Sequence, residues 1–332
     1  MKRFDHAALK QAAREDLSHA SADTGRTVLI HTGASVATIF LLAVLDYFLN
    51  RQIGATGGLS GLDRRAMLST VQMVLRFLYV ALLPFWLIGY TFFTLQLSQR
   101  NNAGPASLLE GFNRFNAVLR LLFLKSFLIG GVLFFGIQAG YFLFCFTPWA
   151  APLLEVAQTI VESGESVDIL LLEEDMFAAF LEVKIPLLST VILTALIFGA
   201  PIFYRFRLAD LYLLEHPEEG AFRALAASTR LMRGSYGAMF RLDLHFLWYH
   251  GLNLLILLIG CAGIILSVAE IQVPIPSDVV PMIAAALYAL LSLAVAWWQK
   301  NPVRLAYVHA YEILQDPPEE PEPEPGSQPW TY

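Results

Sequence analysis

The chain has 332 residues, of which 56% are hydrophobic and only 15% are charged. This composition lies outside the range of soluble globular domains and indicates a membrane protein. The formal net charge of −6 gives no general acidic character, because the acidic excess is confined to Glu155–Glu182 and to the residues after Gln315. The arginines lie along the ends of apolar runs rather than among exposed aromatic residues, so nucleic acid is excluded as an expected partner.

Residues 1–26 are polar and charged, and Lys2–Leu17 has a helical pattern in which Phe4, Ala8 and Ala12 recur among the charges. We expect a cytoplasmic amphipathic helix here. So long a polar lead is not typical of a secretory signal, and we therefore expect the apolar run that follows to be retained as a membrane span.

Six apolar runs follow along the chain, each long enough to cross a hydrocarbon core that needs roughly 20 apolar residues in a helix. We predict an all-α fold, a polytopic membrane helical bundle of about six transmembrane helices within residues 27–315, with amphipathic helices at the interface. The predicted spans are Thr27–Leu49, Val71–Leu97, Ala117–Phe146, Phe180–Phe203, Leu244–Val268 and Val279–Gln299.

The distribution of lysine and arginine predicts the orientation of this bundle, because such residues beside membrane spans remain in the cytoplasm. Placing the N terminus inside leaves few of them on the outer side, namely Arg51, Arg64, Arg65, Arg76 and Lys184. The inner side then holds the larger set, which comprises Lys2, Arg3, Lys10, Arg14, Arg26, Arg100, Arg114, Arg120, Lys125, the arginines of residues 204–243, Lys300 and Arg304. The sequence thus predicts an N-in, C-in, multi-pass protein of the cytoplasmic (plasma) membrane.

The outer loop of residues 147–179 contains no lysine or arginine but many acidic residues. Leu153, Ala157 and Val161 recur at helical spacing, and a second helical stretch follows Gly164. We expect an acidic helical hairpin on the outer membrane surface, whose carboxylates form a solvated face rather than a cation site.

The C-terminal residues 316–332 begin with alternating proline and glutamate. Such a composition neither forms a helix nor buries a core, so we expect an extended, disordered acidic tail.

The inner loop of residues 204–243 is rich in arginine. Pro217–Arg233 has the signals of a capped amphipathic helix, with proline at its first position, glutamates in its first turn and Gly234 after its end. We expect this helix to be a structural connector at the interface, and a regulatory or binding role is the alternative. We interpret the arginines of the loop as anchors of the topology: Arg205, Arg207, Arg223, Arg230, Arg233 and Arg241.

Short motifs at the ends of the spans carry a family resemblance. A Gly-Phe-x-x-Phe element made by Gly111, Phe112 and Phe115 precedes the third span. Further motif positions surround the fifth span and follow the sixth: Ser228, Leu231, Met232, Gly234, Phe240, Asp243, Phe246, Trp248, Pro302 and Tyr311. Together with the basic first helix, these motifs resemble a bacterial integral-membrane family catalogued as domain of unknown function 975.

The resemblance covers most of residues 1–314 and implies a helical membrane architecture without an assigned activity. It also implies a distant likeness to the membrane domains attached to glycerophosphodiester phosphodiesterases, although their catalytic barrel is absent here. The acidic outer loop, the tail, His245 and His250 depart from the family pattern.

The sequence lacks the common motifs of catalysis and of cofactor binding. The glycine-rich residues 54–61 lack the Lys-Ser/Thr ending that binds phosphate, and neither HExxH nor CxxC nor Gly-x-Ser-x-Gly occurs. Cys145 and Cys261 fit no zinc or redox motif, and we expect free thiols. We therefore predict no catalytic residue, no metal site and no cofactor.

These observations favour a non-enzymatic protein that acts in envelope maintenance, assembly or partner binding. The expected partners are the lipid bilayer and either another membrane protein or a second copy of the chain. A transporter or permease component is the alternative, because Pro84, Pro186 and Pro201 can kink spans as transport requires. A membrane enzyme acting on lipids is the third hypothesis.

Overall fold

The computed structural model describes residues 5–20, 23–55, 60–101, 103–163, 169–262, 266 and 279–315, and within these ranges it contains helices and turns but no strand. The elements are α1 His6–His19, α2 Asp23–Ala55, α3 Ser60–Ser98, η1 Pro105–Leu109, α4 Glu110–Asn113, α5 Phe115–Phe144, η2 Pro148–Ala150, α6 Ala151–Ser163, α7 Ile169–Arg205, α8 Ala209–Glu215, η4 Pro217–Glu219, α9 Gly220–Met232, α10 Tyr236–His245, α11 Leu247–Gly260, α13 Val280–Val295, η5 Ala296–Lys300 and α14 Asn301–Gln315. The predicted all-α class is confirmed.

Among the described residues, five stretches of helix are long and apolar enough to cross a membrane: Asp23–Leu49, Ala66–Ser98, Phe115–Phe144, Phe177–Glu215 and Met282–Gln315. The pair α10 and α11 passes the same test only together, and its two helices meet at a bend of 63°. With 14 residues, α11 alone is about 21 Å long, whereas a hydrocarbon core is about 30 Å thick. The structure therefore matches the six predicted spans only where α10 and α11 count as one.

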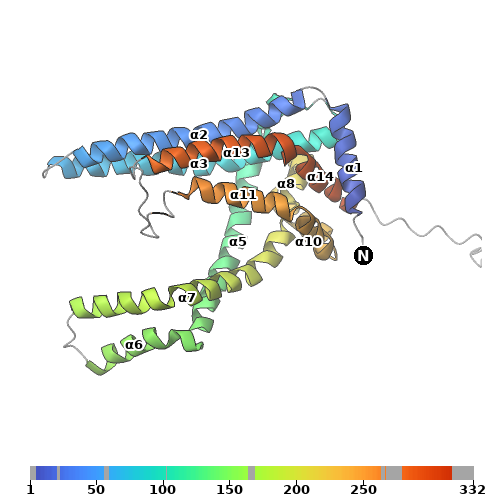
Figure 1. The fold of residues 1–332 in the computed structure, drawn as a ribbon. Helices are drawn as coiled ribbons and strands as arrows, with labels where there is room; N and C mark the ends of the chain where they lie inside the picture. The colour runs from blue at the N-terminus through green and yellow to red at the C-terminus, as the bar shows by residue number, and fades with distance from the viewer. Residues whose placement is uncertain are drawn as a thin grey trace, which may run out of the picture.

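The helices form two groups that diverge from each other (Figure 1). In the first group, α2, α3 and α13 run side by side, and α11 lies against α13. At one end of this group α1 packs on α14, near α8 and α10. We call α1, α8, α9, α10 and α14 the basic end. The second group, α5, α6 and α7, we call the arm.

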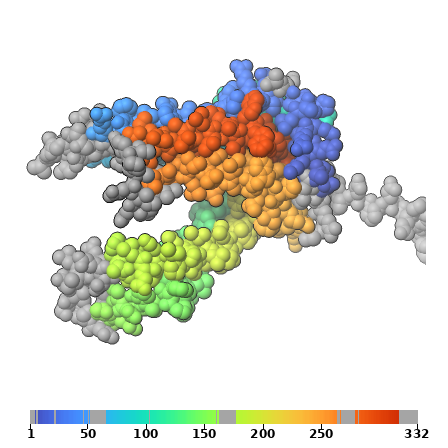
Figure 2. Space-filling model, in the orientation of Figure 1, coloured from blue at the N-terminus to red at the C-terminus, as the bar shows by residue number. Residues whose placement is uncertain are grey.

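The arm is held together by close contact between α5 and α7. A Cβ atom added at Gly140 would lie 2.7 Å from the Cα atom of Val191, and one at Gly199 would lie 2.5 Å from a methyl group of Leu133. Small residues of this kind let two membrane helices approach closely. Figure 2 shows a hollow between α7 and the helices α11 and α13, which separates most of the arm from the first group on this face.

The largest cluster of buried side chains lies where the basic end meets α3 and α5. Leu9 of α1, Phe85 of α3, Val118 of α5, Met239 of α10 and Tyr311 of α14 all belong to it. Because these residues are far apart in the sequence, this core fixes how the spans are arranged at their predicted inner ends.

The first helix, α1, begins at an N-cap aspartate and is fastened to α14. The Asp5 carboxylate accepts hydrogen bonds from the N–H groups of Ala7 and Ala8. His309 lies between two carboxylates, with its Nδ1 2.8 Å from Glu312 Oε2 and its Nε2 2.8 Å from Asp16 Oδ2. The second contact is close but is not aligned as a hydrogen bond. A helix therefore lies where the sequence predicts one, and it packs against α14.

The predicted surface helices are also present. The helix expected at Pro217–Arg233 appears as the turn η4 followed by α9, and Gly234 after it has a φ of +81°. In the outer loop, α6 packs against α7, but the second stretch is the first part of the long helix α7 rather than a separate helix. Cys145 and Cys261 are free thiols. The predicted acidic tail, residues 316–332, lies outside the described residues.

Candidate functional site

Four side chains from three segments meet at the basic end. Tyr204 lies in the last turn of α7, and Arg207 follows in the short turn before α8. Asp243 comes from α10 and Tyr307 from α14. We call these four residues the arginine junction.

The carboxylate of Asp243 is the centre of the arginine junction. Its Oδ1 accepts hydrogen bonds from Arg207 Nη2 at 2.7 Å and from the Tyr307 hydroxyl at 2.6 Å. Its Oδ2 accepts from Arg207 Nη1 at 2.5 Å and from the Tyr204 hydroxyl. The Arg207 guanidinium carbon also lies 4.5 Å from the centre of the Tyr307 ring. The pair is therefore bidentate and stacked, the geometry in which an arginine binds a carboxylate most strongly.

This geometry leaves Asp243 no oxygen without hydrogen bonds. Each carboxylate oxygen already accepts two, and most of the surface of both side chains is covered. A carboxylate that acts as a base or a nucleophile needs an oxygen that can reach a reacting group. The arginine junction is suited to locking α7, α10 and α14 together. At its edge, His250 Nε2 lies 3.2 Å from the Tyr307 hydroxyl oxygen.

Ser228 makes a second tie beside the junction. Its side chain is fully buried on α9, and its hydroxyl donates to the Arg205 carbonyl at 2.8 Å and accepts from the Leu208 N–H at 3.1 Å. These two backbone groups lie where α7 ends and α8 begins. The helical hydrogen bonding is interrupted at this point. Ser228 supplies partners for two backbone groups that would otherwise be left there without any.

The other predicted arginine anchors lie apart from the junction. All are exposed: Arg205, Arg223, Arg230, Arg233 and Arg241. Arg205 Nε donates to Thr229 Oγ1 and Arg241 Nε to the Gly237 carbonyl. The role of these residues as anchors of topology stays a prediction, whereas Arg207 also has a structural partner that the sequence reasoning did not foresee.

The motif residues before α5 pack against α3. A Cβ added at Gly111 would lie 2.1 Å from the Phe85 carbonyl oxygen, so only glycine fits there. The rings of Phe112 and Phe115 stack on Phe85, with centroid distances of 5.7 Å and 4.7 Å.

The remaining motif positions divide between core and surface. Met232 is buried in the core, and the Tyr311 hydroxyl donates to Glu215 Oε2 at 2.7 Å. Phe240 and Trp248 are exposed, and Pro302 at the start of α14 is partly buried. The motif positions are therefore spread over the contacts between helices and do not form one pocket.

Glu110 lies in α4, outside the candidate spans. Its Oε1 accepts from Arg114 Nε at 2.6 Å and its Oε2 from Asn113 Nδ2 at 3.1 Å. Burial by itself raises the pKa of the Glu110 carboxyl, but these hydrogen bonds and the charge of Arg114 outweigh it and lower the pKa. Arg114 also donates to the Leu214 carbonyl at 2.7 Å, which joins α4 to α8.

A second polar cluster lies between α2, α3 and the start of α14, and the sequence reasoning missed it. Lys300 Nζ is 2.7 Å from His31 Nδ1 and donates to Thr32 Oγ1 at 3.0 Å. It also lies 4.6 Å from the centre of the Tyr90 ring, whose hydroxyl donates to Asn301 Oδ1 at 2.6 Å. We call these five residues the lysine cluster. Lys300 ends η5, a π-helical turn, and such turns are frequent at functional sites.

One signal in the sequence could have indicated the lysine cluster. An ionisable residue inside a membrane span is a functional candidate by default, and His31 lies within the first predicted span. Lys300 had been counted only among the inner positive residues. Within the described residues, no group of three or more His, Cys, Asp or Glu side chains is placed to hold a metal ion.

The comparisons with known proteins agree with the resemblance seen in the motifs. The model of a family described as "Protein of unknown function (DUF975)" matches residues 30–288. No curated protein and no solved structure matches the chain.

Proposed function

The chain belongs to the family described as protein of unknown function (DUF975), and we propose that it is a non-enzymatic multi-pass protein of the bacterial cytoplasmic membrane that binds other membrane proteins during envelope assembly or maintenance. The observation that carries this proposal is the contrast between the basic end and the arm. At the basic end, Arg207 and Asp243 satisfy each other and their neighbours. Such a junction holds a scaffold together and leaves no reactive group free.

The arm presents apolar surface over much of its length. Phe127 and Phe135 of α5 and Ile185, Leu193 and Ile197 of α7 are each more than half exposed. A helix that is apolar all round must be covered by lipid or by protein. Large aromatic side chains are enriched where proteins bind each other, and they favour a protein partner for the arm.

Photocrosslinking in cells tests this proposal. A photoreactive amino acid at Phe127 or Leu193 of the arm should give a protein adduct of defined mass. The same amino acid at Phe77 of α3, which is equally exposed but outside the arm, is the matched control and should give no such adduct. Equal adducts at all three positions, or none at Phe127 and Leu193, would contradict a binding role for the arm.

The non-enzymatic part of the proposal has its own test. The purified protein in nanodiscs of bacterial phospholipid should leave the lipid unchanged when the mixture is followed by mass spectrometry. Sustained turnover that copurifies with the protein through two chromatographic steps would instead support the third hypothesis, an enzyme acting on lipids.

Transport is the second candidate function, and the lysine cluster is the observation that favours it. Ionisable groups buried inside membrane spans often mark the paths of ions or substrates. Lys300 and His31 form such a pair, and Pro84 lies in the middle of α3. Proteoliposomes loaded with a pH-sensitive dye would reveal proton-coupled flux. A leak equal to that of protein-free liposomes would count against transport.

A further inference from the structure

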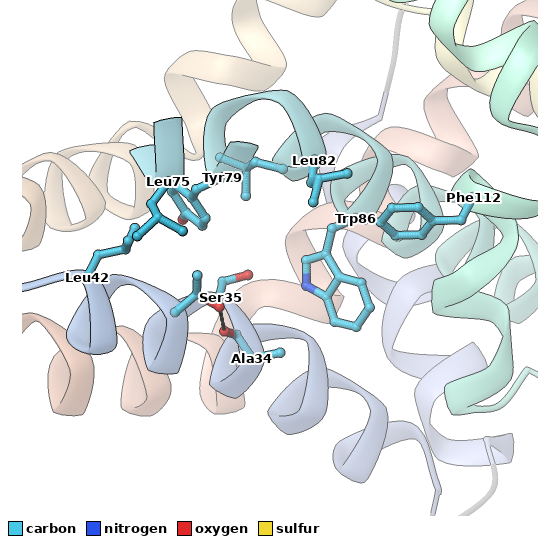
Figure 3. A pocket seen from close by; sticks show the side chains of 10 residues that line it. Ala34, Ser35, Leu42, Leu75, Tyr79, Leu82, Trp86 and Phe112 are labelled. Carbon is cyan, nitrogen blue, oxygen red and sulfur yellow. Dashed lines mark hydrogen bonds between the residues drawn. The ribbon is translucent and has the colours of Figure 1, made fainter. Parts of the chain in front are cut away.

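A cavity lies between α2 and α3 in the first group of helices (Figure 3). Its volume is about 370 Å³. Ala34 and Leu42 of α2 line it from one side, Leu75 and Leu82 of α3 from the other, and Trp86 and Phe112 lie at one end. This volume lies at the lower end of the range of small-molecule sites, roughly 300–1,000 Å³.

The wall of this cavity behaves as an apolar surface. Ser35 Oγ donates to the His31 carbonyl at 3.1 Å and Thr38 Oγ1 to the Ala34 carbonyl at 2.8 Å, so both hydroxyls are satisfied within their own helix. The cavity is open to one side, and a wall that is mostly apolar favours apolar ligands. An alkyl chain fits its shape and its chemistry.

The lysine cluster lies at the end of the cavity that Trp86 closes. The indole ring of Trp86 stacks on His31, with a centroid distance of 5.4 Å and an interplanar angle of 7°. Its Nε1 donates to the His31 carbonyl at 3.0 Å. His31, Ser35, Thr38 and Leu42 follow one another at helical spacing, so His31 continues the stripe of α2 that lines the cavity.

The lysine cluster holds a basic side chain without a matching acid. Within the described part of the chain, Lys300 has no carboxylate at ion-pair distance, and its close contacts are neutral groups on His31, Thr32 and Tyr90. Arg304 lies one turn further along α14 and adds positive charge. A buried cation costs several kcal/mol unless an anion compensates it.

His31 supplies a second, independent sign that a ligand group is missing. The residue is 1% exposed, and its Nε2 atom is buried without a hydrogen-bond partner. When the Lys300 ammonium donates to Nδ1, the ring proton is on Nε2, which then offers an N–H donor. An unpaired buried donor costs about 1–3 kcal/mol. A carboxylate or phosphate oxygen at Nε2 would satisfy this donor, and its negative charge would act on Lys300 across the imidazole ring.

We propose that the α2–α3 cavity and the lysine cluster together bind a single-chain amphiphile with an acidic head group. The alkyl chain occupies the cavity between Leu42 and Trp86, and an oxygen of the head group accepts the Nε2–H of His31. Lys300 lies at Nδ1 on the opposite side of the ring and attracts the anion through its charge. Trp86 lines the cavity and stacks on the His31 ring, so it touches both parts of the site. This site is independent of the interaction role proposed for the arm, because the two lie in different groups of helices.

Binding of tritiated myristate to the immobilised full-length protein in detergent tests the proposal. Unlabelled myristate should compete, whereas myristyl alcohol, which has the same chain without the charge, should compete at least about tenfold more weakly, because a hydrogen bond to a charged group contributes about 1.5–3 kcal/mol. Monomyristoyl lysophosphatidate distinguishes the sources: stronger competition than by myristate identifies a phosphate head group, and weaker competition a carboxylate. Equal competition by the alcohol would overturn the proposal.

Substitutions locate the site. Lys300→Met should weaken myristate binding about tenfold or more, and Ala34→Phe, which fills the cavity, should weaken it similarly. Lys184→Met, on the exposed face of α7, is the matched control and should change binding by less than about twofold. A folded Lys300→Met variant that keeps full affinity would refute the site. If that variant does not fold, the comparison of acid and alcohol on the unsubstituted protein decides the question.

Discussion

Arg207 and Lys300 are two partly buried basic residues in different regions of the molecule, and their surroundings are opposite. Arg207 in the arginine junction faces a carboxylate, Asp243, which binds it through two hydrogen bonds and is itself bound by two tyrosines. Lys300 in the lysine cluster faces a neutral histidine and a threonine, and no acid lies at ion-pair distance among the described residues.

The difference separates a structural charge from one that is available to a ligand. A bidentate pair with saturated oxygens fastens helices to each other, and removing either partner leaves the other buried and uncompensated. A cation without a counterion weakens the fold in the empty state and gains from an incoming anion. Removing the partner of Arg207 should therefore lower the stability of the protein, whereas replacing Lys300 should leave the stability unchanged or raise it.

Asp243→Asn should have the largest effect. The substitution keeps the shape of the side chain but leaves the Arg207 guanidinium buried without a countercharge, so we expect a loss of about 3–5 kcal/mol in the free energy of unfolding. Thermal unfolding in detergent, followed by circular dichroism, measures it. The control Arg233→Gln, at an exposed position, should change stability by less than about 0.5 kcal/mol.

A double variant sharpens this result. Arg207→Met combined with Asp243→Leu removes both charges, so it should be less destabilising than Asp243→Asn alone. If the double variant is the less stable of the two, the cost comes from lost packing at the junction rather than from an uncompensated charge.

Ser228→Ala should have the next largest effect. It removes the hydroxyl that satisfies the Leu208 N–H and the Arg205 carbonyl, and buried groups left unpaired cost about 1–3 kcal/mol. The midpoint of chemical or thermal unfolding reports the loss. Ser189→Ala is the control, because the Ser189 hydroxyl is exposed and bonds only the Pro186 carbonyl of its own helix. Equal stability of the two variants would show that the tie at Ser228 is unimportant.

Lys300→Met tests whether stability changes in the opposite direction at the lysine cluster. Replacing an uncompensated buried ammonium by an apolar group of similar length should leave the ligand-free protein unchanged or stabilise it by about 1 kcal/mol or more. The melting temperature in detergent without added amphiphile is the measurement. A destabilisation as large as that expected for Asp243→Asn would mean that Lys300 is a structural cation like Arg207, and the contrast between the two would fail.

Acidification should reveal the smallest effect, at Glu110. Its folded-state pKa is lowered below 4.5, so its hydrogen bonds to Asn113 and Arg114 stabilise the protein at neutral pH. This stabilisation is present above the unfolded pKa and is lost as the pH falls below about 4.5 through the folded pKa. Comparing the melting temperatures of the unsubstituted protein and Glu110→Gln from pH 7 to pH 3 isolates it. The difference should shrink toward low pH, and a constant difference would contradict this account.

The helical membrane character could be predicted from the sequence, because hydropathy and helical periodicity are local properties of each segment. The helix α9 was predicted for the same reason, since its proline start and its glycine end are neighbours in the chain. The break between α10 and α11 at Phe246 was not, because neither proline nor glycine marks it. It arises where Met239 and Leu242 of α10 are buried at the basic end while α11 continues along α13.

The candidate sites were harder to predict than the helices. Arg207 and Asp243 were both noticed as charges near the ends of spans, yet 36 positions separate them, and nothing local shows that they meet. His31 and Lys300 are 269 positions apart. His31 stands out as an ionisable residue inside a predicted span, but nothing local shows that it meets Lys300. No pattern in the sequence predicts the cavity between α2 and α3.

The sequence by itself determined that this protein is a bundle of membrane helices of a recognisable family. The reason is that each span must be apolar along its own length and must form its backbone hydrogen bonds within its own helix. Only the tertiary structure decided which charges neutralise each other and which remain without a countercharge. The physical reason is that the energy of a buried charge depends on distances of a few ångströms to groups brought in from other helices. In the sequence both Arg207 and Lys300 are basic residues near the inner ends of spans, and the fold places a carboxylate beside Arg207 alone of the two.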